Sequence, residues 1–224
     1  MGRERVASSR IIWAIVFLVG GYVVCQAIAD VGATKMVTML GISLPAGSLM
    51  FALTFTLRDL LHKRLGKRWA RAAIVAAAAF NVVQALYLAV MARIPAPPFY
   101  GLGDAWAAIF ALVPSITVAS ILAELISELI DTEVYDLVRR KAPDWPQWTR
   151  VLTSNAVSLP VDSALFGLLA FTLLPQVFGG DPLPFSAAWA IVAGQIVWKA
   201  IITVVSMPAI YLVKDQSLVQ DYGL

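Results

Sequence analysis

The sequence predicts an all-α, polytopic integral membrane protein: a single transmembrane domain over residues 1–224, built as a six-transmembrane-helix bundle. Three observations predict this class. Hydrophobic residues make up 60% of the chain and charged residues 14%, whereas soluble domains average about 45–50% and about 25%. The mean hydropathy is +0.80. Apolar runs such as 72–80 show no alternation of polar and apolar residues, which argues against the strands of a membrane barrel.

The apolar stretches set the predicted spans. A helix needs about 20 apolar residues, within a range of about 17–25, to cross a hydrocarbon core about 30 Å thick. Pro114 falls inside the fourth stretch, and Pro160 and Pro208 are expected to interrupt the fifth and sixth, which membrane helices tolerate where neighbours satisfy the freed carbonyls. Six stretches are predicted to span, of which the second is short: 11–29, 46–61, 72–92, 105–138, 151–174 and 185–213.

Lysine and arginine residues are concentrated in the segments that these spans place on one side of the membrane. The three loops on the other side hold only Lys35 and Arg93. Because short cytoplasmic loops carry an excess of Lys and Arg, we expect both termini to be cytoplasmic and the protein to lie in the cell inner membrane. The basic loops then need no nucleic-acid partner. The thirteen residues on the predicted cytoplasmic side are Arg3, Arg5, Arg10, Lys63, Arg64, Lys67, Arg68, Arg71, Arg139, Arg140, Lys141, Arg150 and Lys214.

The composition also excludes several kinds of chemistry. One cysteine, Cys25, cannot form an internal disulfide, and with one histidine, His62, it cannot make a His/Cys metal site. No histidine lies in a predicted span to act as a base, so we expect no enzymatic activity. The chain lacks a G-x-x-x-x-G-K-S/T nucleotide-binding loop, so it does not itself hydrolyse ATP. Neither a metal nor a cofactor is expected.

Polar side chains inside the predicted spans are the candidates for function. A charged side chain at the bilayer centre costs about 2.5–3.5 kcal/mol on insertion scales. Many of these residues recur at helical offsets of three, four or seven and therefore share one face of their helix. We expect the two polar faces to meet each other or a wet cavity. They consist of Ser120, Glu124, Ser127, Glu128, Asp131 and Tyr135 in the fourth span, and of Asn155, Ser158 and Asp162 in the fifth.

Some of these groups have a structural alternative. Asp162 could instead be the partner of Lys199 or Arg58, and the acids at the end of the fourth span could simply be solvated. For Asn81 and Gln26 we favour hydrogen bonding between helices. The candidate substrate-binding residues are Asp162, Glu128, Asp131, Asn155, Ser158, Gln195, Lys199, Asp59 and Phe55.

Four segments resemble a known family. LPAGSLMFALTFTLRDLLHKRLGKRWAR (44–71) is similar to the PAG…F.LTF…D…E.YGKK.AR segment of the vitamin uptake transporter-like (VUT) family, best known as queuosine precursor transporters. Where that family usually has an acid followed by Tyr-Gly, this chain reads HKRLG (62–66). Three more segments resemble helices of the family in the same order: ASILAELISELIDTEVYDLVRR (119–140), SNAVSLPVDSALF (154–166) and WKAIITVVSMPAIYLVK (198–214).

The resemblance implies import of a 7-deazaguanine, either 7-cyano-7-deazaguanine or 7-aminomethyl-7-deazaguanine. A guanine-like edge presents adjacent N–H donors, which one carboxylate, of Asp162 or Glu128, can accept in bidentate fashion. Such pockets combine apolar walls with a few placed polar groups, and helices broken near the midplane, here at Pro160 and Pro208, are where transporter sites form. The remaining contacts are expected from Asn155 and Gln195, with stacking by Phe51, Phe55 or Phe166.

The alternative is the substrate-binding subunit of an energy-coupling-factor vitamin transporter, which has a similar length and number of spans. The sequence leaves open whether the chain acts as a homo-oligomer or with a separate energising module. It also leaves open whether carboxylates such as Glu124 and Glu128 carry protons or the flow is facilitated.

Overall fold

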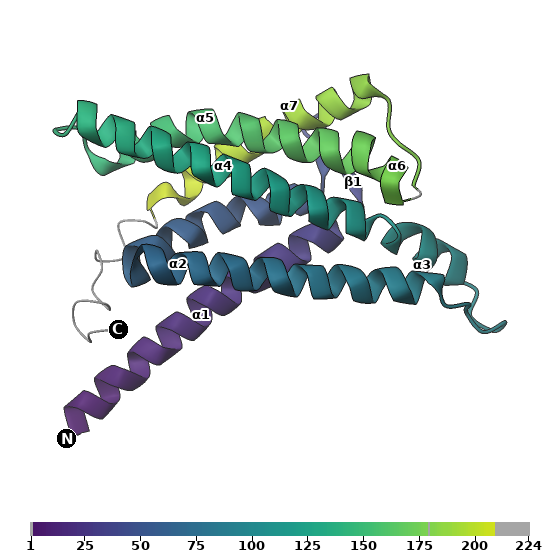
Figure 1. Ribbon diagram of the computed structural model, residues 1–224, viewed down its shortest axis with the longest axis horizontal. Coiled ribbons are helices and arrows are strands. Elements are labelled where there is room, and N and C mark those ends of the chain that lie inside the picture. The colour runs from purple at the N-terminus through teal and green to yellow at the C-terminus, as the bar shows by residue number, and fades with distance from the viewer. Residues whose placement is uncertain (1, 179, 209–224) are drawn as a thin grey trace.

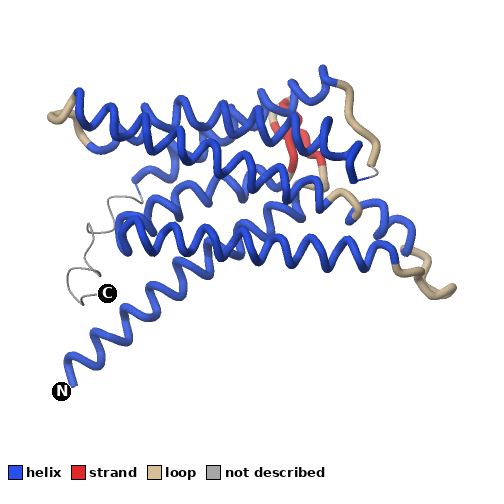
Figure 2. Tube along the Cα trace, in the orientation of Figure 1, coloured by secondary structure: helices blue, strands red, loops and turns tan. Residues whose placement is uncertain are grey.

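The computed structural model describes residues 2–178 and 180–208 of the chain. Helices make up nearly all of this part, and a short hairpin supplies the strands (Figure 2). The all-α, polytopic fold class is therefore confirmed. In chain order the elements are α1 (Gly2–Gly32), β1 (Met36–Met39), β2 (Ile42–Pro45), α2 (Gly47–Arg93), α3 (Gly103–Phe110), α4 (Val113–Lys141), α5 (Gln147–Leu168), a π-helical turn (Leu169–Leu173), α6 (Leu174–Phe178) and α7 (Phe185–Ser206).

Helical segments long and apolar enough to cross a membrane recur along the described chain. The predicted span 46–61 lies within α2 but is not one of them, because a segment of full length there includes Arg58, Asp59 and the basic residues that follow. The five that qualify by length and composition are Ile15–Gly32, Arg68–Arg93, Gly103–Tyr135, Trp148–Phe178 and Phe185–Ser206.

Helix α2 extends from Gly47 to Arg93 but is not straight. Figure 1 shows that its first and second parts run in opposite directions, with the reversal at the left of the view. Helix α1 packs against α2, and the contact includes Tyr22 together with Leu61, Ala73 and Ala77. The small alanine side chains let the helices approach closely, as is usual for membrane helices.

The predicted basic segments lie together in space. In Figure 1 the start of α1, the reversal of α2 and the connection from α4 to α5 all lie toward the left end, whereas the hairpin, α3 and α6 lie toward the right. Lys214 lies outside the described residues. Three of the four basic segments therefore share one end of the bundle, as the charge pattern requires if that end faces the cytoplasm.

The β-hairpin between α1 and α2 was not foreseen from the sequence. Its two-residue turn places Leu40 (φ 53°) and Gly41 (φ 77°) in the left-handed region, which suits a tight hairpin. A Cβ atom on Gly194 of α7 would lie 2.4 Å from the carbonyl oxygen of Ser43, so the hairpin rests directly on the backbone of α7. A Cβ atom on Gly47 would lie only 2.0 Å from a carbonyl oxygen of α1. These contacts bring α1, α2 and α7 together beside the hairpin.

Pro160 and Pro208 were expected to interrupt the fifth and sixth spans, but neither lies at a break within its helix. Pro160 does not interrupt α5, which continues through it from Gln147 to Leu168; the irregular turn comes later, at Leu169–Leu173. Packing against α4 and α7 holds the direction of α5 despite the hydrogen bond that proline removes. Helix α7 ends at Ser206, with Pro208 in the 3₁₀ turn that follows. Pro114 begins α4, where its missing N–H has no intrahelical partner to lose.

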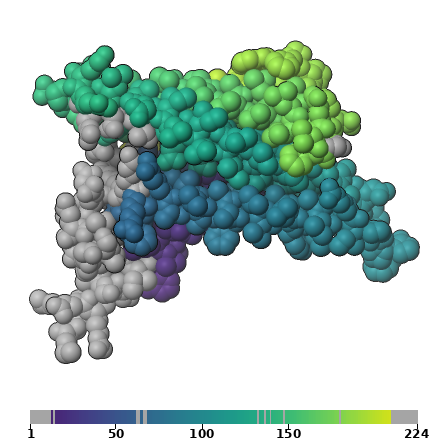
Figure 3. Space-filling model, viewed as in Figure 1, coloured from purple at the N-terminus to yellow at the C-terminus, as the bar shows by residue number. Residues whose placement is uncertain are grey.

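The interior is enclosed by side chains. Figure 3 shows α4 and the second part of α2 in contact along the viewed face, where their side chains cover the interior. The buried side chains of the described residues include an unusual number of polar groups for a chain of this hydropathy, among them Gln26, Asp30, Arg58, Glu124 and Lys199.

Candidate functional site

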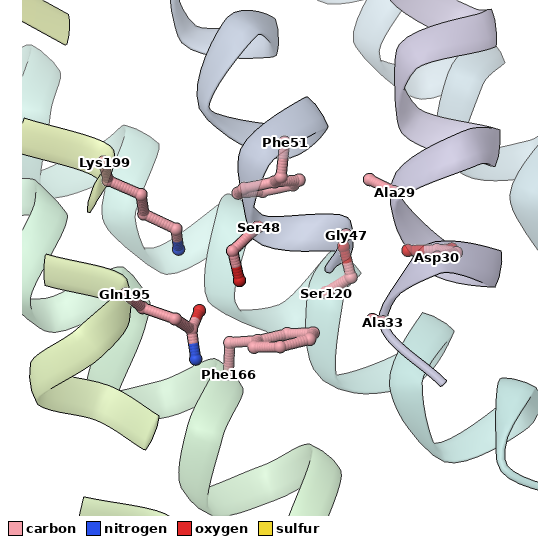
Figure 4. A pocket seen from close by; sticks show the side chains of 10 residues that line it. All are labelled: Ala29, Asp30, Ala33, Gly47, Ser48, Phe51, Ser120, Phe166, Gln195 and Lys199. Atoms are coloured by element: carbon pink, nitrogen blue, oxygen red, sulfur yellow. The ribbon is translucent and has the colours of Figure 1, made fainter. Parts of the chain in front are cut away.

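A cavity lies where α1, α2, α4, α5 and α7 converge, close to the hairpin (Figure 4). Its empty volume is about 250 Å³, which includes its open side. The lining mixes two aromatic rings with carboxylate, hydroxyl, amide and ammonium groups. It consists of Ala29, Asp30, Ala33, Gly47, Ser48, Phe51, Ser120, Phe166, Gln195 and Lys199.

Lys199 forms a buried ion pair on one side of this cavity. Its Nζ atom lies 2.6 Å from Oδ2 of Asp162, and both side chains are inaccessible to solvent, at 1% and 0% exposure. The hydroxyl of Ser127 donates to Oδ1 of Asp162 at 3.2 Å. The same Nζ atom lies 4.9 Å from the ring centre of Phe51 and 6.0 Å from that of Phe166, so the rings also face the cation. The structural alternative for Asp162, pairing with Lys199, is thus what the geometry shows.

The amide of Gln195 lies one turn of α7 before Lys199 and points into the cavity (Figure 4). The side chain is fully buried, yet its Nε2 atom has no hydrogen-bond partner among the described residues. A buried donor without a partner is unfavourable. Gln195 therefore borders the cavity with an amide whose donor is not satisfied within the described part of the chain.

Asp30 faces the cavity from α1. It is buried, and its Oδ2 atom accepts a hydrogen bond of 2.9 Å from the hydroxyl of Thr117 on α4. The hydroxyl of Ser120 lies beside the same carboxylate. A carboxylate that faces a cavity and is held by hydroxyl groups keeps capacity to accept further hydrogen bonds.

A third buried carboxylate, Glu124, lies on α4 one turn beyond Ser120. The hydroxyl of Tyr22 donates a hydrogen bond to Oε1 of Glu124, and Nε2 of Gln26 lies 3.0 Å from both carboxylate oxygens. Gln26 thus links α1 to α4, as expected for an interhelical amide, and its partner there is a buried carboxylate.

The third polar group surrounds Arg58 of α2. Its guanidinium lies 5.0 Å from the ring centre of Phe55 and interacts electrostatically with Asp59, Asp131 and Glu128. The hydroxyl of Ser158 donates to Oδ1 of Asp131 at 3.0 Å. This cluster lies away from the cavity, closer to the connection between the end of α4 and the start of α5.

The polar face of α4 contacts all three of the last sites described: Asp30, Glu124 with its donors, and the cluster around Arg58. Thr117, Glu124 and Asp131 are spaced by seven residues, about two turns or about 10 Å each. They bond in turn to Asp30, to Tyr22 and Gln26, and to Ser158. The polar faces of the fourth and fifth predicted spans therefore lie against each other and against α1, and they end at the cavity.

The predicted site residues are distributed unevenly over this arrangement. Gln195 and Lys199 line the cavity, and Asp162 touches it through Lys199. Phe55 packs edge-on against the cavity residue Phe51, with ring centres 5.5 Å apart. The binding role of each residue stays a prediction. The remaining candidates lie away from the lining: Asp59, Glu128, Asp131 and Ser158 around Arg58, and Asn155, buried on α5.

Sequence reasoning missed Asp30 as well as the cavity position of Ser48. Asp30 directly follows the predicted span 11–29 and so falls outside it, whereas α1 continues to Gly32. A signal was available, because Tyr22, Gln26 and Asp30 recur at intervals of four and so share one face of a helix.

The fold and this site define a polytopic membrane protein with a polar cavity enclosed among its helices. The family model described as "Putative vitamin uptake transporter" matches residues 45–213, and the chain belongs to this family. The sequence resemblance to the vitamin uptake transporter-like family is thereby confirmed.

A relative with a more specific name supports the same family. The protein named "Probable queuosine precursor transporter" from Bacillus subtilis (strain 168) is 28% identical to this chain over 146 residues. The match covers 64% of this chain and spans 63% of the relative's length, less than two thirds. No solved structure matches the chain.

Proposed function

We propose that the protein imports a queuosine precursor, 7-cyano-7-deazaguanine or 7-aminomethyl-7-deazaguanine, across the inner membrane, with both termini in the cytoplasm. The observation that carries this proposal is the polar cavity enclosed by the helices of a chain from this family. The name of the Bacillus subtilis relative supports the choice of substrate.

The lining of the cavity suits a flat, polar heterocycle. In Figure 4 the rings of Phe51 and Phe166 lie on opposite sides of the cavity, where they can contact the two faces of a planar molecule. Carboxylate, amide and hydroxyl groups lie around the space between them. Small-molecule sites combine apolar walls with a few polar groups that fix orientation, and this lining has that composition.

Binding and release require the lining to move. The empty volume of about 250 Å³ includes the open side of the cavity, so the enclosed space left for a ligand in this conformation is small. The π-helical turn Leu169–Leu173 follows Phe166 directly, and such turns often occur at functional sites. We propose that movement near this turn and at the hairpin contact with α7 opens the site.

Complementation tests the proposed substrate. The chain is expressed in a bacterial host that can neither make nor import deazaguanines, the nitrile or the amine form is supplied in the medium, and queuosine is measured in tRNA. The empty vector and the Lys199→Met variant serve as controls, with the amount of protein in the membrane measured for each. Absence of queuosine despite wild-type protein in the membrane would rule out this substrate.

Proteoliposomes test how transport is energised. Uptake of labelled 7-cyano-7-deazaguanine by the purified chain alone would show that no energising module is needed. Uptake only after addition of a co-purifying ATPase would instead favour the substrate-binding subunit of an energy-coupling-factor transporter.

A further inference from the structure

Two carboxylates lie at or beside the cavity in different electrostatic environments. Asp162 is neutralised by Lys199 at 2.6 Å, and its other oxygen accepts from Ser127 at 3.2 Å. Asp30 lines the cavity, and the donors described around it, the hydroxyls of Thr117 and Ser120, are neutral. Asp30 is therefore the carboxylate that gains most from donors on a bound molecule.

The opposite side of the cavity offers donors. In Figure 4, Asp30 and Gln195 approach the space from opposite sides, with Lys199 next to Gln195. The Nε2 atom of Gln195 is buried and has no partner within the described part of the chain. A molecule that fits must carry donors at the Asp30 end and an acceptor at the Gln195 end.

We infer that Asp30 recognises the guanine-like edge of the cargo by accepting its ring N–H and its exocyclic amino group, while Gln195 donates to an acceptor on the cargo's far side. This inference rests on the proposed function and assigns the recognition role to Asp30 instead of Asp162 or Glu128. Asp162 acts behind the cavity wall, where it holds the ammonium of Lys199 between the two rings.

The test is a binding measurement on the full chain, purified in detergent. The probes are 7-cyano-7-deazaguanine and the analogue that lacks only the 2-amino group, 7-cyano-7-deazahypoxanthine. The nitrile form is chosen because it is uncharged, so that attraction of a cationic side arm to Asp30 cannot mimic recognition of the ring edge. The analogue loses one of two charge-assisted hydrogen bonds and is expected to bind the wild type about tenfold more weakly or worse.

The Asp30→Asn variant is expected to bind both probes weakly and with nearly equal affinity, because its amide presents N–H groups to the donors of the cargo. Gln195→Met is expected to weaken both probes alike and keep their ratio. Asp104→Asn removes an exposed carboxylate from α3 and is expected to match the wild type. A structural role of Asp30 alone would lower both affinities and leave the ratio unchanged.

The inference would be overturned if Asp30→Asn kept the wild-type ratio between the affinities for the two probes. It would also be overturned if the wild type bound both probes equally. If Asp30→Asn does not fold, Asp30→Glu decides: it keeps the charge but displaces the carboxylate, and an unchanged ratio there would also overturn the inference. Wild-type protein that binds neither probe would overturn the nitrile form as the substrate together with this recognition scheme. If the wild type binds the nitrile form tightly but binds the analogue without the 2-amino group equally well, only the recognition by Asp30 is overturned.

Discussion

The ion pair between Lys199 and Asp162 gives the sharpest stability test. Its two atoms are 2.6 Å apart, and the side chains are 1% and 0% exposed. Removal of one partner from a buried pair leaves an uncompensated charge and typically costs about 3–5 kcal/mol, whereas replacement of both partners by apolar residues is often neutral. We expect Lys199→Met and Asp162→Leu each to destabilise the protein by about 3–5 kcal/mol.

The double variant is expected to be close to the wild type, so the two single losses together give a coupling energy of about 6–10 kcal/mol in the double-mutant cycle. The free energy of unfolding is measured for all four proteins in mixed micelles by titration with a denaturing detergent. Lys35→Met, which removes an exposed lysine, is the control. Additive losses in the double variant would show that the two charges do not stabilise each other and would refute the reasoning.

Three further predictions follow from the contacts. Gly47→Ala is expected to destabilise the protein by about 1–3 kcal/mol in the same titration, because its Cβ would meet a carbonyl oxygen at 2.0 Å, whereas Gly20→Ala, with open space around it, should not. Asp162→Asn is expected to abolish uptake of the proposed precursor when rates are compared at matched amounts of protein in the membrane, because the ammonium beside the cavity loses its counter-charge; wild-type rates would contradict that role. A cysteine at Phe99 should react with an impermeant maleimide in intact cells and one at Asp144 only after permeabilisation, and the reverse result would invert the proposed topology.

The helical membrane class follows from the sequence because it depends on composition and span length, which are sums over many residues. The boundaries depend on local packing and were harder to predict. Pro160 illustrates this: a proline weakens a helix, but whether the helix bends depends on the neighbours that hold it, and here α4 and α7 do so. The hairpin was hidden because 36–45 reads only as a short segment between apolar runs.

The site could be predicted only in part, because sequence spacing describes one helix at a time. Helical spacing identified the polar face of α4, because periodicity survives in sequence. It could not show which groups meet across helices. Asp162 pairs with Lys199, 37 residues away, and Glu124 meets Tyr22, 102 residues away. Asp30 falls just outside the predicted span 11–29, and its position beside a cavity depends on residues of α2 and α7 that are distant in sequence.

The three buried carboxylates of the described residues, Asp30, Glu124 and Asp162, differ in which groups compensate their charge. Asp162 faces an ammonium at 2.6 Å, which offsets the cost of placing its charge inside the bundle. Glu124 and Asp30 receive hydrogen bonds from neutral donors, of Tyr22 and Gln26 in one case and of Thr117 in the other. Neutral donors offset less of that cost. Because Asp30 also borders open space, donors brought by a bound molecule can supply the rest, and the cargo edge is where such donors are available.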